Sequence, residues 1–173
     1  TGDGFAMPLF PCVGDVSADG RRGRGHLARA HPHAWAWDGP EPTTVVYHGP
    51  HAYISPSLYD THEAVPTWNY IAVHASGATR VLDAEETQAV LEESIATFEP
   101  AYRAQWDDLD DAFRDGLSAA IVAFEIDVTR LEGKYKLSQN RSTAEQERIV
   151  AHLDASDDTY VSSVGRAMRD RVG

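Results

Sequence analysis

The amino-acid sequence predicts an α+β fold, mainly β, in which peripheral helices accompany an antiparallel sheet. Two β-rich runs, at residues 43–47 and 67–74, flank a stretch that prolines interrupt. A third run, at residues 121–128, alternates apolar and charged side chains, as a half-buried antiparallel strand does. Apolar residues at helical spacing follow Asp83 and Ser142 and predict the accompanying helices.

Shorter strands complete the predicted sheet. Residues 5–13 indicate a strand at an edge or a bulge, because Pro8 and Pro11 interrupt it. Residues 14–21 have the composition of a turn, and residues 77–81 indicate one more strand. Three further prolines are expected to break the ladder and force loops: Pro50, Pro56 and Pro66.

Helix boundaries are marked by capping signals. Asp83 and Glu86 form a capping box at the start of a helix, and Pro100 ends that helix. A second helix is expected at about 108–119, with an apolar stripe of Leu109, Phe113 and Leu117. The acidic residues at its start resemble a metal cluster, but a helix N-terminus also favours negative charge, which is the preferred interpretation. They are Asp107, Asp108, Asp110 and Asp111.

The C-terminal part is predicted to be helical. Ser142 and Glu145 form a second capping box, and a last helix carries an apolar stripe from Val161 to Val172. We expect the helices of residues 142–173 to pack on the domain or on a partner subunit. The length favours a single domain over residues 1–173.

Composition excludes several classes of protein. With 15 basic and 27 acidic residues and a net charge of −12, the chain lacks the basic surface that nucleic acids require, so no nucleic-acid partner is expected. The single cysteine, Cys12, rules out an intrachain disulfide and a multi-cysteine metal site. No apolar run of about twenty residues and no signal peptide are visible. A reduced cytoplasmic location, without a membrane, is therefore expected.

The stretch at residues 48–75 has the composition of a binding surface. It combines histidines, tyrosines, a tryptophan and an asparagine, which supply hydrogen-bond donors and flat stacking partners. Upstream, His26 and Arg29 are three residues apart and can face one side of a turn. Such a pair suits an anionic cofactor group, and the imidazole suits an iron atom as axial ligand. A surface turn of mixed polarity is the alternative.

A basic island follows the strand at residues 121–128. Lys134, Lys136 and Arg141 lie close together in an otherwise acidic chain. Such islands usually bind an anion, although a solvated loop is the alternative.

Three separated motifs resemble the PaiB-like family of flavin-binding split barrels. They are residues 49–56, residues 65–70 with His74, and residues 131–141, in the order that the family shows. The segment at 25–32 is also similar to a family segment. The resemblance implies an antiparallel split β-barrel of the FMN-binding type that forms a homodimer. It also implies that a helix and a strand of the family precede the part of the fold present here.

One segment departs from the family pattern. Ala6-Met7-Pro8 stands where the family commonly has His-Leu-Pro, which removes a polar group from the expected pocket rim. Nearby, Trp35 and Trp37 alternate at period two and indicate a flap, a dimer contact or core packing.

The resemblance leaves three classes of function. They are an FMN-binding negative transcriptional regulator, a flavin oxidoreductase, and a haem-dependent enzyme similar to piperazate synthases. The third class closes an N-hydroxylated ornithine into a cyclic hydrazine amino acid by joining two nitrogens. Eight histidines, most of them between residues 26 and 74, and the departure at Ala6-Met7 favour haem b over FMN.

These considerations assign expected roles. Catalytic residues, as proton donors, are expected to be Tyr70, His51 and Lys136. Cofactor-binding residues are expected to be His26, Arg29, Tyr53, Trp68, Asn69, Lys134, Gln139 and Arg141. His26 is the expected iron ligand, and the expected substrate is a small amino acid whose carboxylate the basic island holds.

Overall fold

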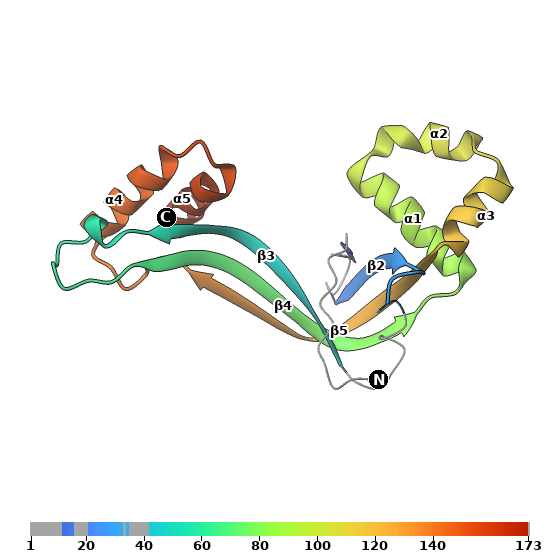
Figure 1. Ribbon diagram of the computed structural model, residues 1–173, viewed down its shortest axis with the longest axis horizontal. Coiled ribbons are helices and arrows are strands. Elements are labelled where there is room, and N and C mark those ends of the chain that lie inside the picture. Colours follow the sequence, from blue (N-terminus) through green and yellow to red (C-terminus); the bar gives the residue numbers. More distant parts are fainter. Residues whose placement is uncertain (1–11, 16–20, 33, 35–41, 173) are drawn as a thin grey trace. The chain divides into compact units, whose positions relative to one another are not determined.

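The computed structural model describes residues 12–15, 21–32, 34 and 42–172 (Figure 1). The strand expected at residues 5–13 lies outside the described residues except for its last two. The predictions for Ala6-Met7 and for Trp35 and Trp37 also lie outside them.

In the described part of the chain, five strands form one sheet in the order β1-β2-β5-β4-β3. Their bounds are β1 Cys12–Asp15, β2 Arg22–Ala28, β3 Thr43–Ile54, β4 Thr67–Val81 and β5 Ile121–Lys136. The pairs β1–β2 and β2–β5 are antiparallel, and the arrows of β3, β4 and β5 alternate in direction in Figure 1. The expected antiparallel sheet with peripheral helices is confirmed.

The strands are longer than the sequence indicates. The runs at 67–74 and 77–81 belong to one strand, β4, and β5 continues through Lys136 into the basic island. The expectation that Pro50 breaks the ladder is wrong, because Pro50 lies inside β3. β3 is the last strand of the described sheet, and an edge strand tolerates proline because one of its sides needs no N–H donor. Likewise, β1 includes Asp15, where a turn was expected.

The chain forms two compact units, which are described here one at a time. The first comprises residues 1–44 and 76–130, and the second comprises residues 45–75 and 131–173. Strands β3, β4 and β5 contribute residues to both units.

Helices of the first unit follow β4. They are α1 Ala84–Phe98, the 3-10 helix η2 Pro100–Tyr102, α2 Arg103–Asp108 and α3 Asp111–Ala119. The capping box of Asp83 and Glu86 is confirmed, with bonds of 2.9 and 3.1 Å between the two residues. Val90 of α1 is buried with Leu82 and Ala123, which attaches the helix to β5.

The second predicted helix starts later than expected. Asp110 is the N-cap of α3 and accepts hydrogen bonds from the backbone N–H groups of Ala112 and Phe113, and Asp111 lies in the first turn, so the interpretation as charge at a helix start is confirmed for these two residues. For Asp107 and Asp108 it is wrong, because they are the last residues of α2. Leu109 lies outside α3, as the C-cap of α2, so the predicted stripe through Leu109 is wrong. Phe113 and Leu117 are exposed.

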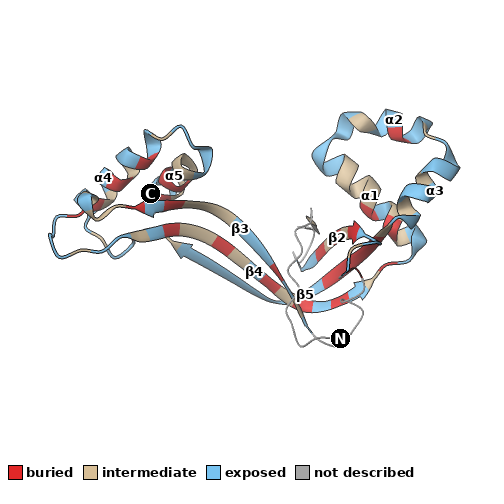
Figure 2. Ribbon diagram, viewed as in Figure 1, coloured by how far each residue is buried: buried red, intermediate tan, exposed pale blue. Residues whose placement is uncertain are grey.

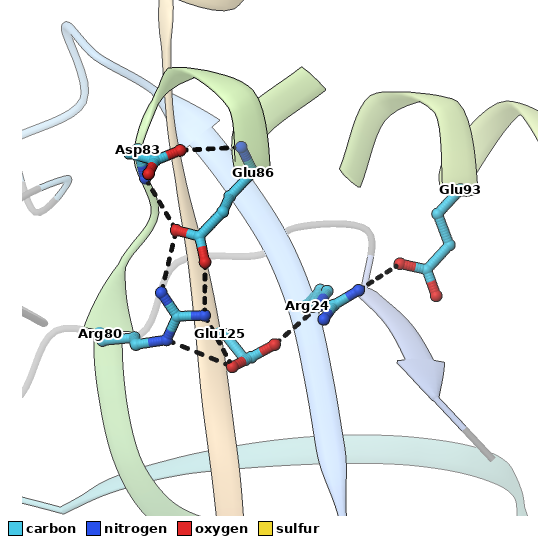
Figure 3. A network of polar contacts seen from close by, with 6 residues as sticks. All are labelled: Arg24, Arg80, Asp83, Glu86, Glu93 and Glu125. Carbon is cyan, nitrogen blue, oxygen red and sulfur yellow. Dashed lines mark hydrogen bonds and ion pairs between the residues drawn. The ribbon is translucent and has the colours of Figure 1, made fainter. Parts of the chain in front are cut away.

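An ion-pair network joins the sheet and α1 in the first unit (Figure 3). The Glu125 carboxylate is buried and accepts hydrogen bonds from Arg24 at 2.8 Å and from Arg80 at 3.1 Å. Arg24 also contacts Glu93, and Arg80 contacts Glu86. Burial alone would raise the pKa of the Glu125 carboxyl, but the hydrogen bonds from both guanidinium groups outweigh burial and lower it.

The second unit carries the C-terminal helices on its part of the sheet. They are α4 Thr143–Asp154 and α5 Thr159–Val172, and a short 3-10 helix, η1 Pro56–Leu58, follows β3. Figure 2 shows buried positions on both α4 and α5. The core of this unit contains Ala52, Ile54, Tyr59, Leu137, Ile149, Leu153, Val164 and Met168. The capping box of Ser142 and Glu145 is confirmed. Within the described part of the chain, no helix is long and apolar enough to span a bilayer.

Candidate functional site

The structure distributes the predicted site residues over three places. His26 and Arg29 lie on or next to β2 in the first unit. In the second unit, four predicted residues line one pocket: Asn69, Lys136, Gln139 and Arg141. Three others form an aromatic surface: His51, Tyr53 and Trp68. Lys134 and Tyr70 belong to the same strands as these residues but not to the pocket lining.

The pocket lies where β4 begins and β5 ends. It has a volume of about 280 Å³, and its other lining residues are Tyr59, Val65, Pro66, Thr67, Ser138 and Asn140. We call this cavity the β4–β5 pocket. Most of its lining side chains are polar or basic, so it suits a polar ligand better than an apolar one.

A tight turn after β5 shapes one wall of the pocket. Ser138 has a positive φ of 58°, which is uncommon for a residue with a side chain. The Gln139 side chain accepts a hydrogen bond from the Leu137 N–H at 2.8 Å and donates one to the Tyr135 carbonyl at 2.5 Å. The Arg141 N–H donates to the Ser138 carbonyl at 3.0 Å. Gln139 therefore braces the turn, and its predicted contact with a cofactor stays a prediction.

Asn69 anchors the turn to β4 and α5. It is fully buried, and its amide group exchanges hydrogen bonds with the Ser138 hydroxyl at 2.9 and 3.1 Å. Its Nδ2 also contacts the Met168 sulfur at 3.5 Å. These bonds satisfy much of the capacity of a buried amide, so Asn69 positions Ser138.

Two cations line the pocket without a carboxylate partner among the described residues. The Lys136 Nζ donates a hydrogen bond to the Thr67 hydroxyl. The Arg141 guanidinium stacks on the Tyr59 ring, with its carbon 3.6 Å from the ring centroid. Both charges are therefore available to an anion that enters the pocket.

Tyr59 is a pocket residue that sequence reasoning missed. It is buried in the core of the second unit, and its hydroxyl has no hydrogen-bond partner among the described residues. A cation–π stack joins residues that are distant in sequence, so no local pattern indicated it. The only available signal was the abundance of aromatic residues at residues 48–75.

The aromatic surface is centred on His51. Its ring lies 4.8 Å from that of His48, 6.1 Å from that of Trp68 and 5.6 Å from that of Tyr160, measured between centroids. Tyr53 meets Trp68 edge to face at 6.0 Å. Trp68 and Tyr53 are 52% and 49% exposed, so about half of each ring is free to contact a ligand. His48 and Tyr160 were not among the predicted site residues.

His26 lies on β2 in the first unit. It pairs with Ala123, and paired residues of an antiparallel ladder point to the same face of the sheet. Ala123 packs with Val90 of α1, so His26 belongs to the face that α1 covers. Burial lowers the pKa of its imidazole, which favours the neutral form. Neutral imidazole is the form that binds metals, so His26 is chemically suited to the predicted role.

Arg29 has contacts that stabilise the fold. Its guanidinium donates hydrogen bonds to the carbonyls of Ala119 at 2.7 Å and Ile121 at 2.8 Å. These carbonyls lie at the end of α3 and the start of β5. The predicted contact of Arg29 with a cofactor stays a prediction. Among the described residues, no group of three or more His, Cys, Asp or Glu side chains is arranged to hold a metal ion.

Comparison with known proteins identifies the family. A model of the family described as "Putative FMN-binding domain" matches residues 3–130. The chain belongs to this family. It is 32% identical over 151 residues to the Protease synthase and sporulation protein PAI 2 of Bacillus subtilis, a match that spans 86% of this chain and 72% of that protein. The resemblance to PaiB-like proteins is thus confirmed.

Two further proteins resemble this chain, one in sequence and one in fold. An uncharacterized protein of Emericella nidulans is 26% identical over 181 residues, covering 86% of this chain and 72% of that protein. The solved FAD and Heme binding protein from Mycobacterium smegmatis has a TM-score of 0.53 and 16% identity, over 76% of this chain. The chain spans 60% of the length of that structure. The expected fold, an antiparallel split barrel with peripheral helices, is confirmed.

Proposed function

We propose that this chain binds a flat, anionic redox cofactor, either flavin mononucleotide or haem b, and acts in redox-type chemistry. The observation that carries the proposal is the half-exposed aromatic surface around His51 in a member of the FMN-binding family. The Mycobacterium smegmatis protein of similar fold binds FAD and haem, which supports a flavin or a haem as the cofactor.

The residues of the second unit fit such a group. Trp68 and Tyr53 offer ring faces and edges against which a planar cofactor packs, and aromatic pairs of this kind contribute beyond the buried area. The buried Nδ1 of His51 has no hydrogen-bond partner among the described residues, so it is a polar atom that a ligand can satisfy. The homodimer expected from the family remains part of the proposal.

The narrower form of the proposal is a haem-dependent N–N bond-forming cyclase. It is supported by the position of His26, which is half-buried on β2, where burial lowers the pKa of an imidazole that suits an iron ligand. Haem, when bound, supplies Lewis-acid polarisation of an N–O bond. Tyr70, His51 or Lys136 would supply the proton that the hydroxyl oxygen takes up as the N–O bond breaks, and the second amine of an N-hydroxylated ornithine would attack the same nitrogen to form the N–N bond. The closure releases water and needs no external electron. A flavin oxidoreductase or regulator is the alternative.

Cofactor choice is tested by titrating cofactor-free protein with FMN and with haem b and recording absorption spectra. We expect saturable binding of one of them, weakened about tenfold by Trp68→Ala, because stacking on an aromatic ring contributes about 1–3 kcal/mol and a loss of about 1.4 kcal/mol lowers affinity tenfold. Phe113→Ala, which removes an exposed ring from the first unit, is the control. His26→Ala should abolish haem binding and leave FMN binding unchanged. Failure of both cofactors to bind would contradict the proposal.

The narrower proposal requires a second measurement. Haem-loaded protein is incubated with an N-hydroxylated ornithine in the absence of reductant, and the product is analysed by mass spectrometry. We expect a cyclic product that is lighter than the substrate by one water molecule. A haem-loaded protein that leaves the hydroxylamine unchanged would exclude the cyclase and retain the cofactor-binding proposal.

A further inference from the structure

We propose that the β4–β5 pocket is a binding site for a small oxyanion, a carboxylate or a phosphate. The site does not require the aromatic surface or a cofactor. The inference deepens the proposed function. It rests on that function only for the identity of the molecule to which the bound anionic group belongs.

The size of the pocket limits its ligand. A volume of about 280 Å³ holds on the order of nine non-hydrogen atoms, if each takes the share of liquid volume that a water molecule has. Sites for whole drug-sized molecules usually begin near about 300 Å³. The pocket therefore fits a phosphate group, or the carboxylate end of an amino-acid-sized molecule, and not a whole cofactor.

The distribution of charges in the second unit indicates an anion. Arg148 pairs with Asp60, and Arg169 pairs with Asp154, so these arginines are neutralised within the fold. Lys136 and Arg141 line the cavity and have no such partner among the described residues. In a chain of net charge −12, two cations at one cavity that have no ion-pair partner among the described residues are a specific feature.

The neighbouring carboxylate of Glu145 interacts with Arg141 through its charge but forms no ion pair with it among the described contacts. Both oxygens of Glu145 accept hydrogen bonds elsewhere, from the backbone N–H of Asp60 at 3.0 Å and from that of Ser142 at 3.1 Å. These bonds, more than the charge of Arg141, lower the pKa of the Glu145 carboxyl. Glu145 therefore belongs to the helix cap, and the guanidinium of Arg141 keeps donors for a ligand.

The cations are held before a ligand arrives. The Tyr59 ring fixes the guanidinium plane of Arg141, and the hydrogen bond between the Arg141 N–H and the Ser138 carbonyl fixes its backbone. Thr67 holds the ammonium group of Lys136. Groups that are ordered in advance lose less entropy when they bind, which favours affinity for a small ligand. Tyr59 thus acts as a positioning residue through its ring, since its hydroxyl is covered and has no hydrogen-bond partner in the described part of the chain.

The test uses the full chain without cofactor. Backbone amide resonances are followed by NMR while inorganic phosphate or acetate is added at constant ionic strength, with chloride as the reference anion. We expect saturable shifts of the amides of residues 136–141, and weaker binding at higher salt because ionic contacts are screened. Shifts that do not saturate, or that chloride reproduces, would overturn the inference.

Variants identify the groups responsible. Lys136→Met and Arg141→Gln should each weaken anion binding about tenfold, as expected for the loss of one charge-assisted hydrogen bond. Arg166→Met removes an exposed charge from α5 and should leave binding unchanged. Tyr59→Phe keeps the ring under Arg141 and should bind as the unmodified protein does, whereas Tyr59→Leu should bind more weakly. Equal affinity in all five variants, each with a native-like amide spectrum, would contradict the assignment.

The anionic group can belong to the cofactor, as its phosphate, or to a substrate, as its carboxylate. Loading the protein with FMN before the anion titration distinguishes these two sources. If the cofactor phosphate occupies the pocket, added phosphate no longer shifts the amides at 136–141, and Lys136→Met also weakens FMN binding. If the pocket holds a substrate carboxylate, acetate binds equally well to the FMN-loaded protein. A chain that binds phosphate but neither FMN nor haem retains this inference and loses the proposed function. If the chain binds a cofactor but no small anion, the proposed function is retained and this inference is wrong.

Discussion

Gly77→Ala is expected to destabilise the protein by about 3 kcal/mol or more, because the new methyl group overlaps the backbone of the neighbouring strand. A Cβ atom at position 77 would lie 1.8 Å from the Asp127 carbonyl oxygen and 3.0 Å from the Val128 Cα. Both are main-chain atoms of β5, so no side-chain rotation relieves the overlap. The pairing of β4 with β5 must open, and urea unfolding measures the resulting loss.

Gly116 provides the matched control. It lies inside α3, and a Cβ atom there would meet no described atom within 4 Å apart from its chain neighbours and the backbone of its own helix. Gly116→Ala should therefore stabilise the protein by about 0.5–1 kcal/mol, because alanine loses less backbone entropy in a helix. Equal urea midpoints for the two alanine variants would show that the close approach at Gly77 does not exist in solution.

Glu125→Ala is expected to destabilise the protein by about 2–3 kcal/mol. The buried carboxylate is the common acceptor of Arg24 and Arg80, and its removal leaves both guanidinium groups without their shared partner. Breaking a fully buried pair costs about 3–5 kcal/mol, and the partial exposure of the two arginines reduces that figure. Asp107→Ala breaks an exposed pair with Arg103 and should leave the urea midpoint nearly unchanged.

The contribution of Glu125 should depend on pH in a defined direction. The folded state lowers the pKa of the carboxyl below the value of 4.5 that it has in an unfolded chain. The stabilisation is therefore complete above that value, and it decreases as the pH falls from 4.5 through the lowered pKa. The difference in unfolding free energy between the unmodified protein and Glu125→Gln should be constant at neutral pH and shrink below pH 4.5. A difference that grows on acidification would contradict this account.

Signals within a few residues of each other predicted local structure well. The capping boxes at Asp83 and Ser142 formed as expected, because each requires only side chains and N–H groups three residues apart. The apolar positions Val122, Phe124, Ile126 and Val128 are all buried in β5, since strand periodicity places them on one face. The family motifs also predicted the split-barrel fold correctly.

Pairings between distant segments could not be predicted in the same way. Pro50 is compatible with β3 only because that strand ends the described sheet, and strand order is set by contacts over the whole chain. Glu125 alternates with apolar residues like an exposed position, yet it is buried because Arg24 and Arg80 neutralise it. A periodic pattern carries no information about a partner on another strand.

The candidate site shows the same division. The class of ligand could be predicted from the basic island and the aromatic stretch, because charged side chains bind anions and aromatic side chains stack on flat groups. Its geometry depends on tertiary structure: Arg141 stacks on Tyr59, which lies 82 positions earlier in the chain, and Asn69 bonds Ser138, 69 positions away. Residue types thus predicted which ligands are possible. Only the folded chain decided which cations line one cavity without an ion-pair partner among the described residues, because ion pairing depends on distances that chain topology creates.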